Sequence, residues 1–122
     1  MKIYIAGSSQ ERERYREAIR GIEDRITFNW DAHLTLHENA TDSERRVLFE
    51  SASQLCLAGV MSADALVLLI PKNKSHGAWF EAGVAYGARI PIYAVGYGNV
   101  DIWEQAFTQS FRTMAECIEY LE

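Results

Sequence analysis

The feature that most constrains the fold is an unbroken apolar run at residues 65–70, Ala-Leu-Val-Leu-Leu-Ile. A strand buried on both faces has such a run, whereas a strand with one solvated face alternates apolar and polar residues. Pro71 follows and ends the segment, because proline has no amide proton to donate within a sheet. The run therefore predicts a central strand of a parallel sheet that is covered by helices.

The rest of the chain alternates predicted strands with predicted helices. Further strands are expected at residues 3–6, 25–30, 91–95 and 110–112, and helices at 11–20, 41–62, 77–88 and 114–121. We expect Ser9 and Thr41 to cap the first two helices, and residues 31–39 to form a loop. This order predicts an α/β fold: a three-layer, doubly wound parallel sheet with the flavodoxin-like order 2-1-3-4-5, in one domain over residues 1–122.

Charge and composition exclude several classes of protein. Twelve Lys and Arg against 17 Asp and Glu give a net charge of -5, which argues against a nucleic-acid polymer as partner. No apolar run approaches the roughly 20 residues of a membrane span, and the first apolar stretch is too short for a signal peptide. Cys56 and Cys117 lie in helical patterns, so no disulfide scaffold is expected. We expect a cytoplasmic protein that does not bind membranes.

Two polar loops should lie beyond the carboxyl ends of the strands, where doubly wound sheets bind their ligands. They are residues 7–10, Gly-Ser-Ser-Gln, and residues 72–77, Lys-Asn-Lys-Ser-His-Gly. Each precedes a helix whose free N–H groups could hold an anion. The alternative is that glycine and serine only form tight turns, since neither a Walker P-loop nor a GxGxxG motif occurs. The hydroxyl and cationic residues in or near these loops are Ser8, Ser9, Ser75, Arg12, Lys72 and Lys74.

Glu81 is the most informative single residue. It lies near the start of a helix built from Ala, Gly, Trp and Phe that should pack against the buried sheet. A carboxylate in that position is costly unless it has a partner or a task, such as ligand binding, general base catalysis or nucleophilic attack on a sugar carbon. The alternative is a glutamate that only complements the helix dipole.

The histidines and the charged run at residues 11–17 carry weaker signals. His33 and His37 are four residues apart in a predicted loop with no third ligand in sequence reach, so we predict no metal site and no cofactor. His76 lies in the second polar loop, where it either lines the ligand site or is simply solvated. The charged run predicts a solvated helix face with local charge pairs.

Taken together, these residues resemble the nucleoside 2-deoxyribosyltransferase superfamily. The resemblance is greatest to its 2'-deoxynucleoside 5'-phosphate N-hydrolase branch and to short phage-type members. It lies in four blocks, residues 2–8, 27–30, 57–64 and 75–83. The last block, Ser-x-Gly-x-x-x-Glu-x-Gly at the start of a helix, is the most specific.

The resemblance implies a role for individual residues. Glu81 matches the catalytic nucleophile, which attacks the anomeric carbon as in retaining glycoside hydrolysis, and Tyr4 matches a tyrosine that orients this carboxylate. Ser8 and Ser75 match positions that hold the 5' end of the substrate. Transferases of free nucleosides have an acidic residue at the position of Ser75, so serine favours a 5'-monophosphate, which a carboxylate would repel. The other binding residues expected on this basis are Gly7, Ser9, Arg12, Cys56, His76 and Gly77.

Two positions depart from the family pattern. Cys56 stands where the family usually has an aspartate that handles the leaving base, and a thiol is a poor substitute for a carboxylic acid. Gln10 stands where an arginine is typical, with Arg12 two residues further on. Asp64 is present, but it matches a structural position at the start of a strand.

Three functions remain open on the sequence. The first is an N-glycosidase or deoxyribosyltransferase that acts on a nucleoside 5'-monophosphate. The second is a non-catalytic nucleotide or signal-nucleotide binding protein, with which Cys56 is consistent. The third is a TIR-like NAD glycohydrolase, although no adenine-binding feature is evident. We also expect a homodimer or higher homo-oligomer, because a small monomer does not easily bury all of Trp79, Phe80, Tyr86, Trp103 and Phe107.

Overall fold

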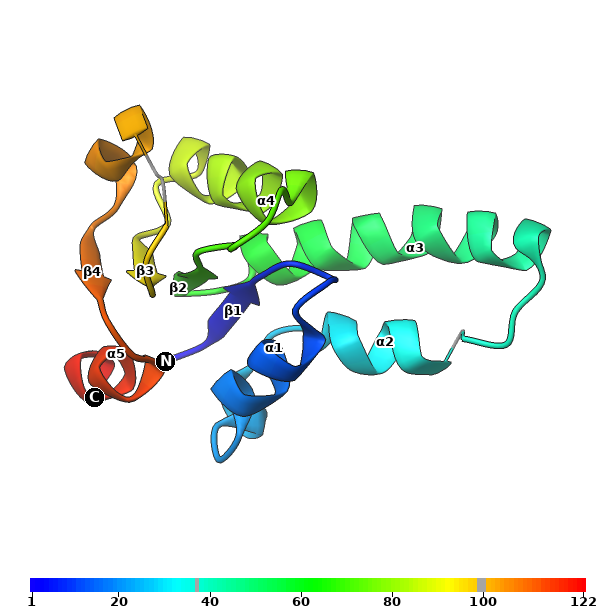
Figure 1. The fold of residues 1–122 in the computed structure, drawn as a ribbon, viewed down its shortest axis with the longest axis horizontal. Helices are drawn as coiled ribbons and strands as arrows, with labels where there is room; N and C mark the ends of the chain where they lie inside the picture. The colour runs from blue at the N-terminus through cyan, green and yellow to red at the C-terminus, as the bar shows by residue number, and fades with distance from the viewer. Residues whose placement is uncertain (37, 99–100) are drawn as a thin grey trace.

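In the computed structural model, which describes residues 1–36, 38–98 and 101–122, four parallel strands carry helices on both faces (Figure 1). The strands are β1 (Ile3–Ala6), β2 (Ala65–Leu69), β3 (Ile92–Val95) and β4 (Gln109–Phe111). The α-helices are α1 (Arg12–Ile19), α2 (Trp30–Leu36), α3 (Asp42–Met61), α4 (His76–Gly87) and α5 (Met114–Leu121). Two short 3-10 helices, η1 (Glu23–Arg25) and η2 (Asp101–Ala106), complete the described elements.

The sheet has the strand order β1-β2-β3-β4, and every neighbouring pair is parallel. Ile3 of β1 lies opposite Ala65 of β2, and Leu66 of β2 lies opposite Ile92 of β3. All residues of β1, β2 and β3 are buried, which confirms the central parallel strand that the apolar run predicts. Helix α4 and the end of α3 cover one face, and α1 and α5 cover the other (Figure 1). The α/β class is therefore as expected.

The strand predicted over residues 25–30 is not present, so the described sheet has four strands rather than five. Residue Ile26 forms only an isolated parallel bridge with Ile3, at the free edge of β1. The reason is local: the Asn29 side chain accepts a hydrogen bond from Ala32 N at 2.9 Å and caps a helix there. Helix α2 therefore replaces most of the loop predicted over residues 31–39.

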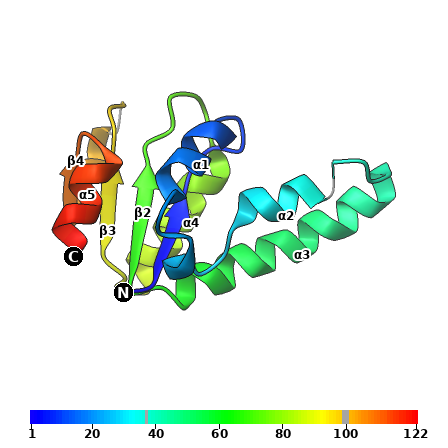
Figure 2. The same ribbon diagram turned by 90° about the horizontal axis from the view of Figure 1, so that it is seen from below.

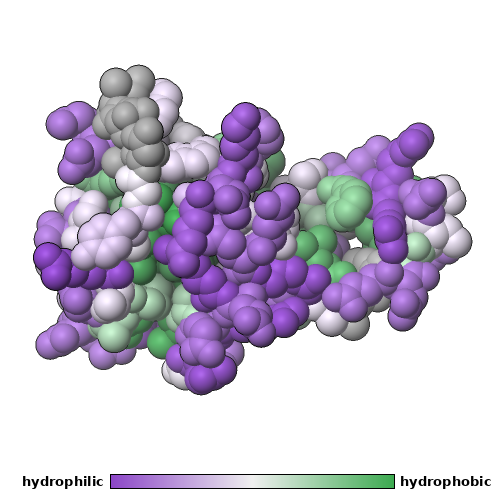
Figure 3. Space-filling model, viewed as in Figure 1, coloured by the Kyte–Doolittle hydropathy of each residue, from purple (hydrophilic) through white to green (hydrophobic). Residues whose placement is uncertain are grey.

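Helices α2 and α3 form an arm that projects beyond the sheet (Figure 2). Thr41 caps α3 as predicted, accepting a hydrogen bond from Glu44 N at 3.2 Å. The 20 residues of α3 span about 30 Å, and only its end packs on the sheet. There Gly59 allows close approach, because a Cβ atom would lie 3.0 Å from Cδ2 of Tyr4. Figure 3 shows hydrophobic residues exposed among hydrophilic ones along this arm. Phe49 of α3 is one of the exposed large hydrophobic residues of the protein.

Helix α1 is tied to the sheet by charged side chains. Arg14 donates from Nη1 to Ile70 O at 2.6 Å and from Nη2 to Val95 O at 3.1 Å. Glu11 accepts from Arg14 Nη1 at 3.2 Å and from Lys72 N at 3.1 Å. The prediction of a purely solvated charged face is therefore wrong for these residues. The predicted cap by Ser9 is also wrong, since Glu11 precedes the helix and forms no side-chain cap bond.

Candidate active site

A cleft of about 400 Å³ opens beyond the carboxyl ends of β1 and β2. The loop after β1, the loop after β2 and the facing sides of α2 and α3 form its walls. The described residues that line it are Gly7, Ser8, Ser9, Gln10, Trp30, Leu34, Ala52, Cys56, Lys74, Ser75, His76, Gly77, Ala78 and Glu81. The cleft therefore brings together eight of the ten site residues expected from the sequence, and Tyr4 and Arg12 are the other two.

Tyr4 lies directly behind the cleft and holds Glu81. Its hydroxyl donates a hydrogen bond to Glu81 Oε2, with an O–O distance of 2.5 Å, across 77 positions of the chain. Tyr4 is fully buried in β1, whereas Glu81 is partly exposed on α4. The thiol of Cys56, on α3, lies beside the same carboxylate. Three elements thus fix one carboxylate at the cleft wall.

Burial determines the protonation of this trio. It raises the pKa of the Glu81 carboxyl, and the Tyr4 hydrogen bond and the neighbouring Cys56 thiol counter part of that increase. Burial, followed by the nearby Glu81 charge, raises the pKa of the Tyr4 phenol, so Tyr4 remains a donor. Burial also raises the pKa of Cys56 to about 11, so its thiol remains protonated. On balance the site disfavours ionisation of Glu81, and the Tyr4 hydroxyl supplies the hydrogen bond that stabilises the carboxylate once it is ionised.

The first polar loop presents a buried serine at the cleft. Ser8 Oγ accepts a hydrogen bond from Gln10 N at 3.1 Å, and Ser8 O accepts one from Glu11 N at 2.9 Å. The hydroxyl of Ser8 keeps its own proton to donate to a ligand. Ser9 is exposed at the mouth of the cleft.

The second polar loop ends at the start of α4. Ser75 caps that helix, and its Oγ accepts from Ala78 N at 3.4 Å. Lys74 and His76 line the cleft on either side of Ser75. Among the described lining residues, Glu81 is the only carboxylate, so this end of the cleft presents hydroxyl groups, a helix N-terminus and a lysine.

The apolar wall of the cleft comes from residues that the sequence analysis missed. Trp30 and Leu34 of α2 and Ala52 of α3 line it. Trp30 donates from Nε1 to Ile5 O at 2.9 Å, and its ring centroid lies 4.3 Å from that of Tyr15. Trp30 and Leu34 could have been found only if α2 had been recognised, and the helix cap at Asn29 was the available signal.

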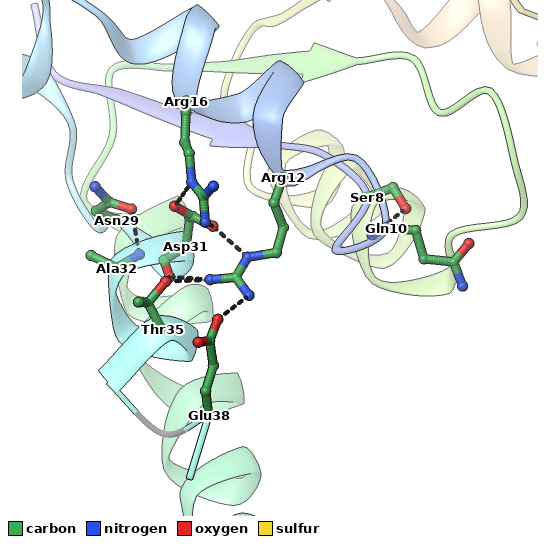
Figure 4. Close-up of polar contacts among 9 residues, drawn as sticks. All are labelled: Ser8, Gln10, Arg12, Arg16, Asn29, Asp31, Ala32, Thr35 and Glu38. Atoms are coloured by element: carbon green, nitrogen blue, oxygen red, sulfur yellow. Dashed lines mark hydrogen bonds and ion pairs between the residues drawn. The ribbon is translucent and has the colours of Figure 1, made fainter.

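Arg12 lies outside the cleft, in the network of Figure 4. Its Nε donates to Asp31 Oδ1 at 2.5 Å, Nη1 to Glu38 Oε1 at 3.1 Å, and Nη2 to Asp31 O at 3.0 Å and to Thr35 Oγ1. Arg16 binds the same Asp31 carboxylate, with Nε 2.8 Å from Oδ2. Burial opposes ionisation of Asp31, but these arginine hydrogen bonds outweigh it and lower the pKa. Arg12 therefore holds α1 against α2.

A second hollow, which Arg12 lines, adjoins the cleft, and His33 contributes to it as well. His37 lies outside the described residues. Within the described ranges, no group of three or more His, Cys, Asp and Glu side chains is arranged to hold a metal ion. Both cysteines are free. Of the helices described, none is long and apolar enough to cross a membrane.

No protein-family model matches this chain, and no curated protein matches it significantly.

Proposed function

We propose that this protein is an N-glycosidase or deoxyribosyltransferase that cleaves the base–sugar bond of a (deoxy)nucleoside 5'-monophosphate, with Glu81 as the nucleophile. The observation that carries the proposal is the Glu81 carboxylate, which is held by Tyr4 at 2.5 Å in the wall of a cleft with no second carboxylate among its described lining residues. A positioned, half-buried carboxylate is the nucleophile that retaining glycoside chemistry requires.

The reaction needs two steps at Glu81. First, a carboxylate oxygen bonds to the anomeric carbon while the bond to the base nitrogen breaks, and the electron pair leaves with the base, which takes up a proton. Water or a second base then attacks the same carbon and restores the carboxylate. Tyr4, whose raised pKa keeps its proton in place, orients the carboxylate throughout.

The polar end of the cleft suits a phosphate better than a free 5'-hydroxyl. Ser8 and Ser75 offer hydroxyl donors, and the N-terminus of α4 adds partial positive charge. Lys74 lines the same end. Because none of these groups is negative, a phosphate meets no repulsion there.

Replacing Glu81 tests the chemistry directly. Glu81→Gln keeps the shape of the side chain but cannot act as a nucleophile, so we expect it to abolish base release while ligand binding is retained. Base release from a panel of deoxynucleoside monophosphates is followed by chromatography, and ligand binding by calorimetry. Glu119→Gln, on an exposed part of α5, is the matched control. Normal base release by Glu81→Gln would exclude the proposed nucleophile.

A non-catalytic nucleotide-binding protein is the second candidate, and Cys56 is the observation that favours it. With a pKa raised to about 11, its thiol is a weak acid beside the position of the leaving base. A wild-type protein that binds nucleotides but releases no base from any of them would favour this candidate.

We also propose that the protein forms a homodimer or higher homo-oligomer through exposed aromatic residues. Trp79, Tyr86, Trp103 and Phe107 line an apolar groove of about 390 Å³ beside α4. Trp103 is 59% exposed and Tyr86 is 64% exposed, which is unusual for large side chains in a small monomer. We expect light scattering at micromolar concentration to give at least the mass of a dimer. Trp103→Glu should reduce it, whereas Tyr97→Glu, at an exposed tyrosine outside the groove, should not.

A further inference from the structure

The cleft continues into a second hollow between α1, α2 and α3. This hollow has a volume of about 340 Å³ and shares Ser9 and Leu34 with the cleft. The described residues that line it are Ser9, Arg12, His33, Leu34, Glu38, Arg45, Leu48 and Phe49. A mononucleotide held at Glu81 and at the polar end of the cleft leaves this second hollow unused.

The second hollow has an apolar entrance and a basic end. Leu34 lies at the border with the cleft, and Leu48 and Phe49 follow along α3. Arg45 donates from Nη2 to Glu38 O at 2.8 Å, and it forms no ion pair among the residues described. The Glu38 carboxylate is instead paired with Arg12. Arg45 therefore brings to the second hollow a positive charge that is in no direct ion pair with a described carboxylate, although Asp42 and Glu50 line a neighbouring hollow with it.

We propose that the ligand carries a chain on its base, and that this chain runs through the second hollow and ends in an anionic group bound by Arg45. This inference rests on the proposed function, because that function places the base. The phosphate occupies the end formed by Ser8 and Ser75, so the base lies against Trp30, Leu34 and Ala52. Leu34 also borders the second hollow, so a substituent on the base reaches it.

The chemistry of the lining specifies the substituent. The part of the substituent next to the base is apolar, because it passes Leu34, Leu48 and Phe49. Its end is a carboxylate or another anion, because a guanidinium binds planar anions through paired hydrogen bonds. The ligand class is therefore a nucleoside 5'-monophosphate with an anionic, chain-bearing base.

Calorimetry with paired ligands tests the inference. The probes are dAMP with a carboxylated alkyl chain on its exocyclic amine, and dUMP with the same chain at C5. Each is compared with a nucleotide whose chain has equal length but ends in a methyl group. We expect one carboxylated probe to bind about tenfold more tightly than its methyl counterpart. Arg45→Ala should remove this difference, and Arg45→Lys should restore part of it.

Arg46→Ala is the matched control, because Arg46 is the next residue of α3 and is not among the described residues that line the second hollow. It should leave the difference between the probes unchanged. Equal binding of the carboxylated and methyl probes to the wild type would overturn the inference. So would an equal loss of the preference for the carboxylated probe in the Arg45→Ala and Arg46→Ala variants.

The same measurement separates this inference from the proposed function. The free bases that carry the two chains, without sugar or phosphate, are tested as well. If the carboxylated free base binds more tightly than the methyl one, and Arg45→Ala removes this difference, the inference is supported even if no nucleotide is cleaved. Base release from unmodified nucleotides, with no effect of the carboxylate, supports the proposed function and overturns the inference.

Discussion

Removing the hydroxyl of Tyr4 should make the stability of the protein more dependent on pH. In the wild type, this hydroxyl donates to Glu81 Oε2 at 2.5 Å, from a fully buried position. A hydrogen bond to a charged partner contributes about 1.5–3 kcal/mol, and one between neutral groups about 0.5–1.5 kcal/mol. Tyr4→Phe should therefore cost about 1–1.5 kcal/mol more when Glu81 is ionised than when it is protonated.

The direction follows from the raised pKa of Glu81. Because the folded protein holds this proton more tightly than the unfolded chain does, the contribution of Glu81 to stability is greatest at low pH. It falls as the pH rises from the usual carboxyl range through the raised pKa of the folded state, and it is constant above that. The Tyr4 hydrogen bond lowers the pKa of Glu81, so Tyr4→Phe should raise that pKa. The decrease in stability should then continue to a higher pH than in the wild type.

Urea unfolding of four proteins measures this effect, from about pH 4 to about pH 8. They are the wild type, Tyr4→Phe, Glu81→Gln and the double variant. In the Glu81→Gln background, Tyr4→Phe should have the same cost at every pH. Tyr15→Phe is the control, because the Tyr15 hydroxyl is buried without a hydrogen-bond partner among the described residues. A cost of Tyr4→Phe that does not change with pH in the wild type would refute the reasoning.

Two further predictions concern binding and turnover. Ser75→Asp should weaken binding of a nucleoside monophosphate at least about tenfold in calorimetry, because a carboxylate repels phosphate. Since Asp and Asn both cap helices well, Ser75→Asn should fold equally and keep most of the affinity; equal losses in both would contradict the charge argument. Cys56→Asp should raise kcat for base release about tenfold or more if the thiol limits protonation of the base, while Cys56→Asn should not. Slower turnover in Cys56→Asp would show that this position has another role.

Much of the fold could be predicted because its signals are local. The apolar run at residues 65–70 specifies β2, and the bounds predicted for the last helix are those of α5. Thr41 caps α3 where the spacing of Thr41 and Glu44 places a capping box. Strand burial and helix caps depend on residues within a few positions of one another, so a linear pattern is sufficient to reveal them.

The convergence of the polar loops could also be anticipated, because the carboxyl ends of neighbouring parallel strands meet at one edge of the sheet. For that reason Ser8 and Ser75 line one cleft although they lie far apart in the sequence. The contact between Tyr4 and Glu81 was expected only through the family resemblance. No local pattern links a residue of β1 to one of α4.

Other features were decided by tertiary structure alone. Residues 25–30 have the alternation of a strand, yet Asn29 caps a helix and Thr27 donates from Oγ1 to Gly59 O at 2.8 Å. Arg14 has the pattern of a solvated helix residue, but it binds carbonyl oxygens at the ends of β2 and β3. By itself, the sequence determined the four strands that form, most of the helices and the edge of the sheet where a ligand would bind, but it also predicted a strand over residues 25–30 that is absent. Only the packing of α2 and α3 decided the apolar wall and the second hollow, because those surfaces join residues whose neighbours are set by the whole fold.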